Sequence, residues 1–126
     1  MTSVEHVHAL WSALESGGPL AALELIDDEC EWVPSPDFPE GRPIRGAQEM
    51  RAYLDELTRN GVRFEPALHT CEAVGDHVLV GGRIRVVSRA ALSDSPLFWV
   101  YRMRGERVSR IESYPSRRDA LSAVAA

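Results

Sequence analysis

The spacing of apolar residues predicts helices in the first half of the chain, with one short strand between them. Intervals of three and four, typical of one helix face, occur twice, at Val4, Val7, Leu10, Trp11 and Leu14 and at Met50, Leu54 and Leu57. Glycines at positions 17 and 18 and Asn60 with Gly61 are suitable helix ends. Pro19 suits the first turn of a short second helix over residues 19–26. The run Glu29–Val33 is then predicted to be the first strand.

The period changes from 3.6 to 2 after residue 61, which predicts strands. One face would hold Val62, Phe64, Leu68 and Thr70, and the other Arg63, Glu65, His69 and Cys71. Turn residues at 75–76, 93–95 and 105–106 separate four strands, of which the third, "PLFWVYRM", is apolar on both faces. Pro115 precedes a closing helix with Ser116 as its N-cap. The element order α-α-β-α-β-β-β-β-α predicts an α+β fold, a curved antiparallel sheet wrapped by three to four helices, in a single domain over residues 1–126.

Composition narrows the class of protein. The chain of 126 residues is 44% hydrophobic and 26% charged, which is ordinary for a globular domain. Its formal net charge of −5 argues against a nucleic-acid partner. No apolar run approaches the roughly 18 residues of a membrane span, and the first residues lack the basic start of a secretory signal. We therefore expect a cytoplasmic protein that does not bind a membrane.

The metal-binding residue types occur without the spacing of a metal site. Cys30 and Cys71 lie far apart in the sequence, and the four histidines form no ligand pattern. We expect two free thiols in partly buried positions rather than a disulfide. Nothing in the sequence calls for a metal, a nucleotide or a flavin, so no cofactor is expected.

Several motifs together resemble the SnoaL-like branch of the nuclear transport factor 2 superfamily. They are "DDECEW", followed by a proline-rich loop and "IRGAQEMRAYL", the hairpin "FWVYRMRGERVSRIESY", and the tail "SRRDAL". The resemblance implies a cone-shaped half-barrel with an internal pocket and a homodimer formed through the outer face of the sheet. Known activities in the superfamily include polyketide cyclases, ketosteroid isomerase and limonene epoxide hydrolase.

The catalytic residues of these relatives do not carry over. The positions matching the isomerase aspartate base, its second aspartate and its tyrosine hold Trp32, Trp99 and Trp11. An indole cannot act as a base near neutral pH, so that chemistry is disfavoured. The Asp-Arg-Asp relay of the epoxide hydrolases has no match on the inward positions either.

Three carboxylates remain as catalytic candidates. Glu112 lies where polyketide cyclases carry their base, and it either faces the pocket or pairs with Arg110 on the outer face, because a one-residue change of register reverses a strand residue. Asp37 and Glu40 lie on the proline-rich loop, which would be a lid or a brace beside the pocket mouth.

The alternation also predicts an aromatic pocket suited to a small apolar or aromatic ligand. Its ligand-binding residues would be Trp11, Trp32, Met50, Phe64, Trp99, Tyr101 and Ser113, with the last two as polar handles. Phe98 and Val100 would form the centre of the dimer interface on the other face.

Three functions remain open at this level. The first is a cyclase or isomerase acting on a small cyclic apolar molecule, the second a non-catalytic protein that binds a hydrophobic ligand, and the third a dimeric scaffold with a filled cone.

Overall fold

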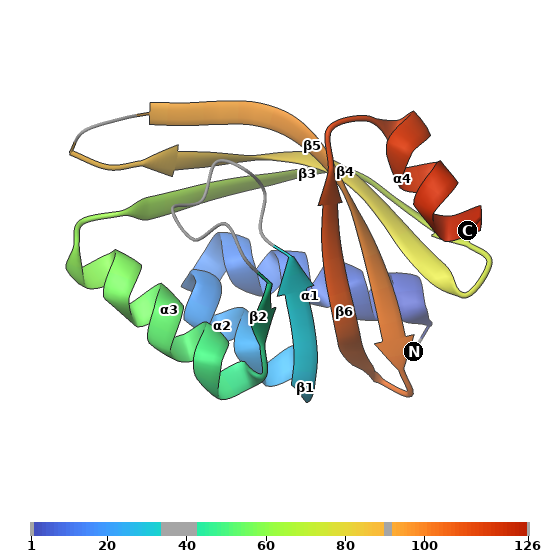
Figure 1. Ribbon diagram of the computed structural model, residues 1–126, viewed down its shortest axis with the longest axis horizontal. Helices are drawn as coiled ribbons and strands as arrows, with labels where there is room; N and C mark the ends of the chain where they lie inside the picture. Colours follow the sequence, from blue (N-terminus) through green and yellow to red (C-terminus); the bar gives the residue numbers. More distant parts are fainter. Residues whose placement is uncertain (1, 34–42, 90–91, 126) are drawn as a thin grey trace.

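A computed structural model of the chain describes residues 2–33, 43–89 and 92–125. They form one six-stranded sheet with four helices (Figure 1). In chain order the elements are α1 (Ser3–Gly17), α2 (Pro19–Ala22), the 3-10 turn η1 (Leu23–Leu25), β1 (Ile26–Val33), β2 (Ile44–Arg45), α3 (Ala47–Arg59), β3 (Arg63–Val74), β4 (His77–Val87), β5 (Leu92–Arg104), β6 (Arg107–Tyr114) and α4 (Arg117–Ala125). The predicted α+β class is confirmed. The second helix is shorter than predicted, the first strand begins three residues earlier, and β2 was not foreseen.

The strands lie in the order β2-β1-β6-β5-β4-β3, and the sheet is mixed. The pairs β3–β4, β4–β5 and β5–β6 are antiparallel, as predicted. Strand β1 instead pairs parallel with β6, so the predicted antiparallel sheet carries one parallel pair that the sequence did not indicate. Parallel partners need a long crossover between them, and α3 together with the strands β2, β3, β4 and β5 supplies it here. An alternating pattern of apolar residues predicts a strand, but it does not predict which strand will pair with it.

The sheet bends sharply where β4 carries two consecutive glycines. A side-chain carbon added at Gly82 would lie 2.4 Å from the carbonyl oxygen of Ala67 on β3. Opposite this point β3 contains an irregularity between Leu68 and Thr70. The extra residue reverses the facing of the rest of the strand, because strand side chains alternate. Cys71 therefore packs against the main core, where the simple alternation had placed Thr70.

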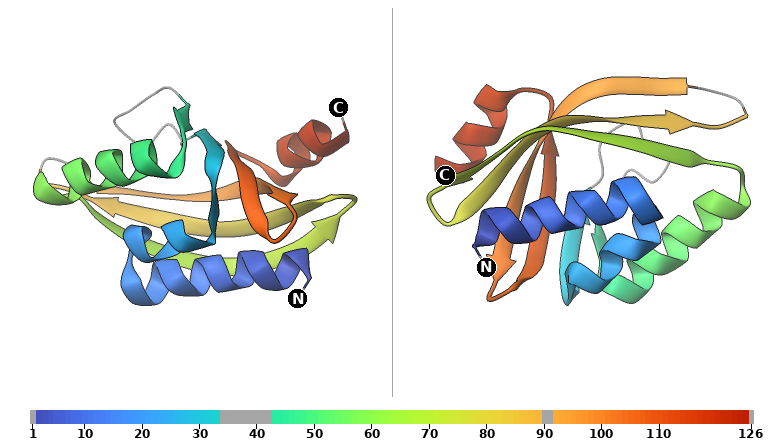
Figure 2. Two further views of the ribbon diagram at one scale, coloured as in Figure 1. Left: turned by 90° about the horizontal axis from the view of Figure 1, so that it is seen from below. Right: turned by 180° about the vertical axis from the view of Figure 1, so that it is seen from behind.

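Helices α1 and α2 lie on the concave side of the sheet, as Figure 2 shows from below and from behind. Thr2 caps α1 through a capping box with Glu5, which satisfies free backbone N–H groups at the helix start. The helix buries Val7, Leu10 and Trp11. It runs along the edge strand β3, where a carboxylate oxygen of Glu15 accepts a hydrogen bond from the Leu68 N–H at 3.3 Å.

Helix α4 lies on the opposite, outer side of the sheet (Figure 2). Ser116 caps it as predicted, since its hydroxyl accepts from the Asp119 N–H at 3.1 Å. Ala120 packs with Leu79 and Val100 in a small second core, and Val100 is only 1% exposed. Because a helix of the same chain covers Val100, its predicted place at the centre of a dimer interface was wrong, while the dimer itself stays a prediction.

None of the helices in the described part of the chain combines the length and apolar character needed to span a bilayer.

Candidate functional site: an apolar pocket inside the cone

The concave side of the sheet encloses a pocket of about 100 Å³. Its wall is formed by residues of α1, α2, η1, α3 and five strands, so residues far apart in the sequence meet there. For scale, an engineered apolar cavity of about 150 Å³ is enough to hold benzene. The lining residues are Leu10, Trp11, Leu14, Ala22, Leu23, Ile26, Trp32, Met50, Leu54, Phe64, Pro66, Ile84, Trp99, Tyr101 and Ile111.

The deep end of the pocket is a fixed aromatic cluster. The rings of Trp11 and Trp99 meet edge to face, with centroids 5.0 Å apart and planes at 64°. The indole N–H of Trp11 donates to the hydroxyl oxygen of Tyr101 at 2.9 Å. All three side chains are at least 96% buried. Since this hydrogen bond joins α1 to β5, it holds the first helix against the floor of the cone.

The other end of the pocket is less enclosed. Trp32 on β1 is half-buried, and its ring lies 5.9 Å from that of Tyr53 on α3. Phe64, Pro66 and Ile84 line the same side and are also half-buried. The indole of Trp32 therefore forms a wall between the interior and the more exposed rim.

The chemistry of the described lining residues is almost wholly apolar. They include no carboxylate, imidazole or amine, and the Tyr101 hydroxyl is their only oxygen-bearing side-chain group. Burial raises the pKa of Tyr101 well above its usual range, so the hydroxyl keeps its proton. Among these residues it accepts one hydrogen bond, from Trp11, and its own O–H remains available to donate to a ligand.

Six of the seven predicted ligand-binding residues line the pocket: Trp11, Trp32, Met50, Phe64, Trp99 and Tyr101. Their role in binding stays a prediction. Ser113 does not line the pocket, because its hydroxyl donates to the carbonyl oxygen of Val33 at 3.3 Å. The predicted set did not include Leu10, Leu14 and Pro66, which also line the pocket. The two leucines could have been found, because they share the apolar face of α1 with Trp11.

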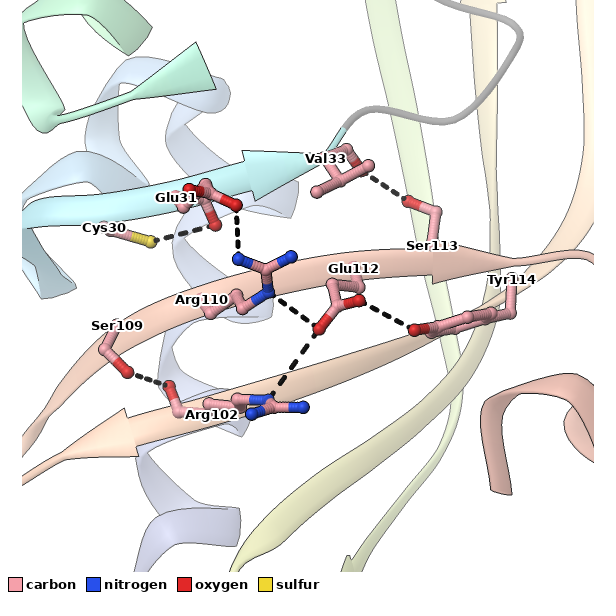
Figure 3. Close-up of polar contacts among 9 residues, drawn as sticks. All are labelled: Cys30, Glu31, Val33, Arg102, Ser109, Arg110, Glu112, Ser113 and Tyr114. Atoms are coloured by element: carbon pink, nitrogen blue, oxygen red, sulfur yellow. Dashed lines mark hydrogen bonds and ion pairs between the residues drawn. The ribbon is translucent and has the colours of Figure 1, made fainter. Parts of the chain in front are cut away.

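Glu112 belongs to an ion-pair network on the outer face (Figure 3). One carboxylate oxygen lies 2.8 Å from Arg110 Nε, and the other accepts from the Tyr114 hydroxyl at 2.8 Å. The Nε of Arg102 lies 3.7 Å away. The alternative that placed Glu112 in the pocket was therefore wrong. The other two candidates, Asp37 and Glu40, lie outside the described residues.

The network also sets the acidity of its members. Burial alone would raise the pKa of Glu112, but the hydrogen bonds from Tyr114 and Arg110 and the nearby arginine charges outweigh it and leave the pKa lowered. Burial and the bond to Glu112 together raise the pKa of Tyr114 to about 12.

A lowered carboxyl pKa predicts a loss of stability in acid. The ionised form of Glu112 stabilises the fold above its unfolded-state pKa, and that stabilisation disappears as the pH falls through the lower folded-state value. Below about pH 4.3, the ordinary value for glutamate, the free energy of unfolding should fall more steeply in the wild type than in Glu112→Gln. Urea titrations between pH 6 and 3 would measure this. Glu65→Gln, at an exposed pair with Arg85, is the matched control, and equal slopes in the Glu112 and Glu65 variants would contradict the prediction.

The two cysteines are free, as expected. Burial raises the pKa of the Cys30 thiol to about 12 and also raises that of Cys71. Neither is a reactive thiolate near neutral pH. Within residues 2–33, 43–89 and 92–125, no cluster of histidine, cysteine and acidic side chains could hold a metal ion.

A curled α+β half-barrel with a pocket on its concave side defines the class of nuclear transport factor 2-like proteins. The family model described as a SnoaL-like domain matches residues 7–111, and the chain belongs to this family.

Solved structures show the same architecture. An NTF2-like protein from Burkholderia thailandensis is 20% identical, with a TM-score of 0.79 and 98% of each chain covered. A putative polyketide cyclase from Pseudomonas putida is 18% identical, with a TM-score of 0.71 and 97% of each chain covered. An LEH-like epoxide hydrolase of M. tuberculosis is 18% identical with a TM-score of 0.71, over 94% of this chain and 86% of that one. At such identities the likeness establishes the fold alone.

One curated protein also matches in sequence, the matrix protein of rabies virus, at 29% identity over 93 residues. The match covers 63% of this chain and 46% of that protein. The chain thus spans about half the length of the curated relative that it matches.

Proposed function

We propose that this protein binds a small, neutral, apolar ring molecule that carries one hydrogen-bond acceptor, such as a cyclic ketone. The observation that supports this most is the buried hydroxyl of Tyr101, the one hydroxyl among the described lining residues of an otherwise apolar pocket. A charged ligand would lose its hydration without finding an opposite charge among the described lining residues. A neutral ring would bury its apolar surface against the indoles and offer its oxygen to Tyr101.

The volume of the pocket limits both the size and the affinity of the ligand. A pocket of about 100 Å³ suits a single ring rather than a fused system. The best small ligands gain at most about 1.5 kcal/mol per heavy atom, and most gain less. A cyclic ketone with seven heavy atoms in total is therefore expected to bind with a Kd on the order of 0.1–1 mM.

A matched pair of probes tests this proposal. Cyclohexanone and methylenecyclohexane have the same ring and number of heavy atoms, but only the ketone has an oxygen acceptor. We expect both to perturb the tryptophan fluorescence and the NMR signals of pocket residues, with cyclohexanone bound about 3- to 10-fold more tightly. No saturable binding of either probe would refute the proposal.

Replacing Tyr101 with phenylalanine should abolish the preference for the ketone. The Tyr101→Phe variant keeps the aromatic ring but removes the donor, so its affinity for cyclohexanone should fall about 3- to 10-fold while methylenecyclohexane binds as before. The buried N–H of Trp11 would also lose its acceptor, which should lower the free energy of unfolding by about 1–3 kcal/mol.

Tyr114→Phe is the control for this prediction, because it removes a hydroxyl from the outer face. It should leave the relative affinities for the two probes unchanged. An unaltered ketone preference in Tyr101→Phe would show that Tyr101 is not the donor.

A second candidate function is proton transfer at the carbon beside such a carbonyl, as in a cyclase or an isomerase. The family and the architecture shared with a putative polyketide cyclase support it. It requires a base, for which Asp37 and Glu40 are the remaining sequence candidates. In deuterated water, an enzyme of this kind would accelerate exchange of the α-hydrogens of cyclohexanone, and Asp37→Asn or Glu40→Gln would abolish the acceleration. Binding without accelerated exchange would favour the non-catalytic function.

The third possibility, a scaffold with a filled cone, is less well supported because a cavity is present. Assembly into a homodimer remains a separate prediction, which sedimentation or light scattering would test.

A further inference from the structure

Strand β1 brings Trp32 to the pocket, yet its backbone pairing with β6 is interrupted. Ile26 lies opposite Val108, and the next regular pair is Glu31 opposite Arg110. Between these points β1 advances by five residues while β6 advances by two. The pairing at Ile26 therefore does not determine which residue of β1 meets Arg110.

The last part of β1 is held by a short stretch of backbone pairing. Glu31, Trp32 and Val33 pair with β6 on one side, where the Ser113 hydroxyl also donates to the Val33 oxygen. On the other side there are two pairs with β2 and a hydrogen bond from the Gly46 N–H to the Cys30 oxygen at 2.7 Å. The facing of this short segment is critical. Because strand side chains alternate, a shift of one residue would turn Trp32 outward and bring the Glu31 carboxylate into the apolar pocket.

Arg110 is placed to prevent that shift (Figure 3). Its Nη1 hydrogen-bonds the carboxylate of Glu31 on β1, while its Nε binds Glu112 on its own strand at 2.8 Å. Glu112 is in turn held by the Tyr114 hydroxyl. The guanidinium is thus fixed on β6 by one carboxylate and reaches a second carboxylate across the strand boundary.

Burial makes this contact stronger than an ordinary surface pair. The side chains of Arg110, Glu31 and Glu112 are 36%, 30% and 18% exposed, whereas Arg85 and Glu65 are 49% and 48% exposed. Exposed pairs contribute little, because water screens them and both side chains lose freedom. Partly buried charges that meet in only one alignment can instead specify that alignment.

We propose that Arg110 is a positioning residue that sets the register of β1 and thereby turns Trp32 into the pocket and Glu31 out of it. The link to ligand binding rests on the proposed function, but the effect on Trp32 does not. Arg110 lies on the face of the sheet opposite the pocket, so it acts through β1 and not by touching the ligand.

Fluorine NMR of protein labelled with 5-fluorotryptophan tests the proposal without any ligand. The protein would give three signals, assigned with Trp11→Phe, Trp32→Phe and Trp99→Phe. In Arg110→Met the Trp32 signal should shift or broaden, while those of Trp11 and Trp99 stay in place. Arg110→Lys, which keeps one charged donor, should restore most of the Trp32 signal. Arg85→Met, which breaks the exposed pair, should leave all three unchanged.

Binding provides a second measurement. The Kd of cyclohexanone should rise about 10-fold in Arg110→Met and stay within about 2-fold of wild type in Arg85→Met. If the wild type binds no cyclohexanone, the proposed function fails while the fluorine result still decides the role of Arg110.

A folded Arg110→Met variant with an unmoved Trp32 signal would overturn the proposal. Should that variant not fold, Glu31→Gln decides the question, because it removes the charge on β1 with almost no change in size. A shifted Trp32 signal in Glu31→Gln supports the proposal, and a spectrum identical to wild type overturns it.

Discussion

Replacing Gly82 with alanine is expected to lower the free energy of unfolding by about 3 kcal/mol or to prevent folding. The new methyl carbon would lie 2.4 Å from the carbonyl oxygen of Ala67, well inside any contact that real side chains make. This oxygen belongs to the backbone of the neighbouring strand, so relief requires the two strands to separate at the bend. Urea denaturation followed by circular dichroism would measure the effect.

Gly105→Asn is the matched control. This glycine occupies a hairpin turn with a φ of +59°, and nothing lies within 4 Å of an added side-chain carbon. Asparagine tolerates such a conformation better than other residues, so the loss should stay below about 1 kcal/mol. If Gly82→Ala were as stable as Gly105→Asn, the close approach of β3 and β4 would not be what shapes the bend.

Replacing Trp11 with alanine is the second change with a large expected effect. The side chain is 1% exposed, packs on Trp99 and donates to Tyr101, so its removal leaves a cavity and a lost hydrogen bond. The free energy of unfolding should fall by about 3–5 kcal/mol. Indole has the shape of the missing group, and its addition should raise the melting temperature of the variant by binding only the folded state.

Trp32→Ala is the comparison, because that indole is half-buried and lies at the more exposed side of the pocket. It should lose clearly less stability than Trp11→Ala. Equal losses in the two variants, or no stabilisation of Trp11→Ala by indole, would contradict the view that Trp11 is the fixed floor of the cone.

Much of the fold and of the pocket follows from periodicity. The apolar face of α1 and the alternation in β3, β4 and β6 are set by local geometry, and the sequence displays them directly. The interior positions of Trp11 and Phe64 follow from these patterns. The same argument holds for Met50 on the apolar face of α3. Strand β5 is apolar on both faces, so the interior positions of Trp99 and Tyr101 follow only when strict alternation is assumed along it.

The remaining features depend on contacts that no local pattern records. The irregularity near Leu68 inserts a residue and reverses the alternation at Cys71. Ser113 shares the inward side of the sheet with Trp99, but Val33 takes up its hydroxyl. The strand alternation places Val100 on the outer face of the sheet, where it would be exposed if α4 did not pack over it. The sequence of this nine-residue helix does not show which surface of the sheet it will cover. The face of the sheet on which Glu112 lies depends on the register of β6, and the sequence did not determine that register.

The contact of Glu15 with β3 has a consequence for how molecules of this protein meet one another. A strand of twelve residues at the edge of a sheet is normally a template on which a second chain can add its own strand. Backbone N–H groups two residues apart point to the same side of a strand. The backbone N–H positions of residues 66 and 68 would therefore both face a strand added at this edge. Pro66 has no N–H to offer, and Glu15 already occupies that of Leu68. An incoming strand would find two successive donors missing in the middle of the edge, which disfavours growth of intermolecular sheets from β3.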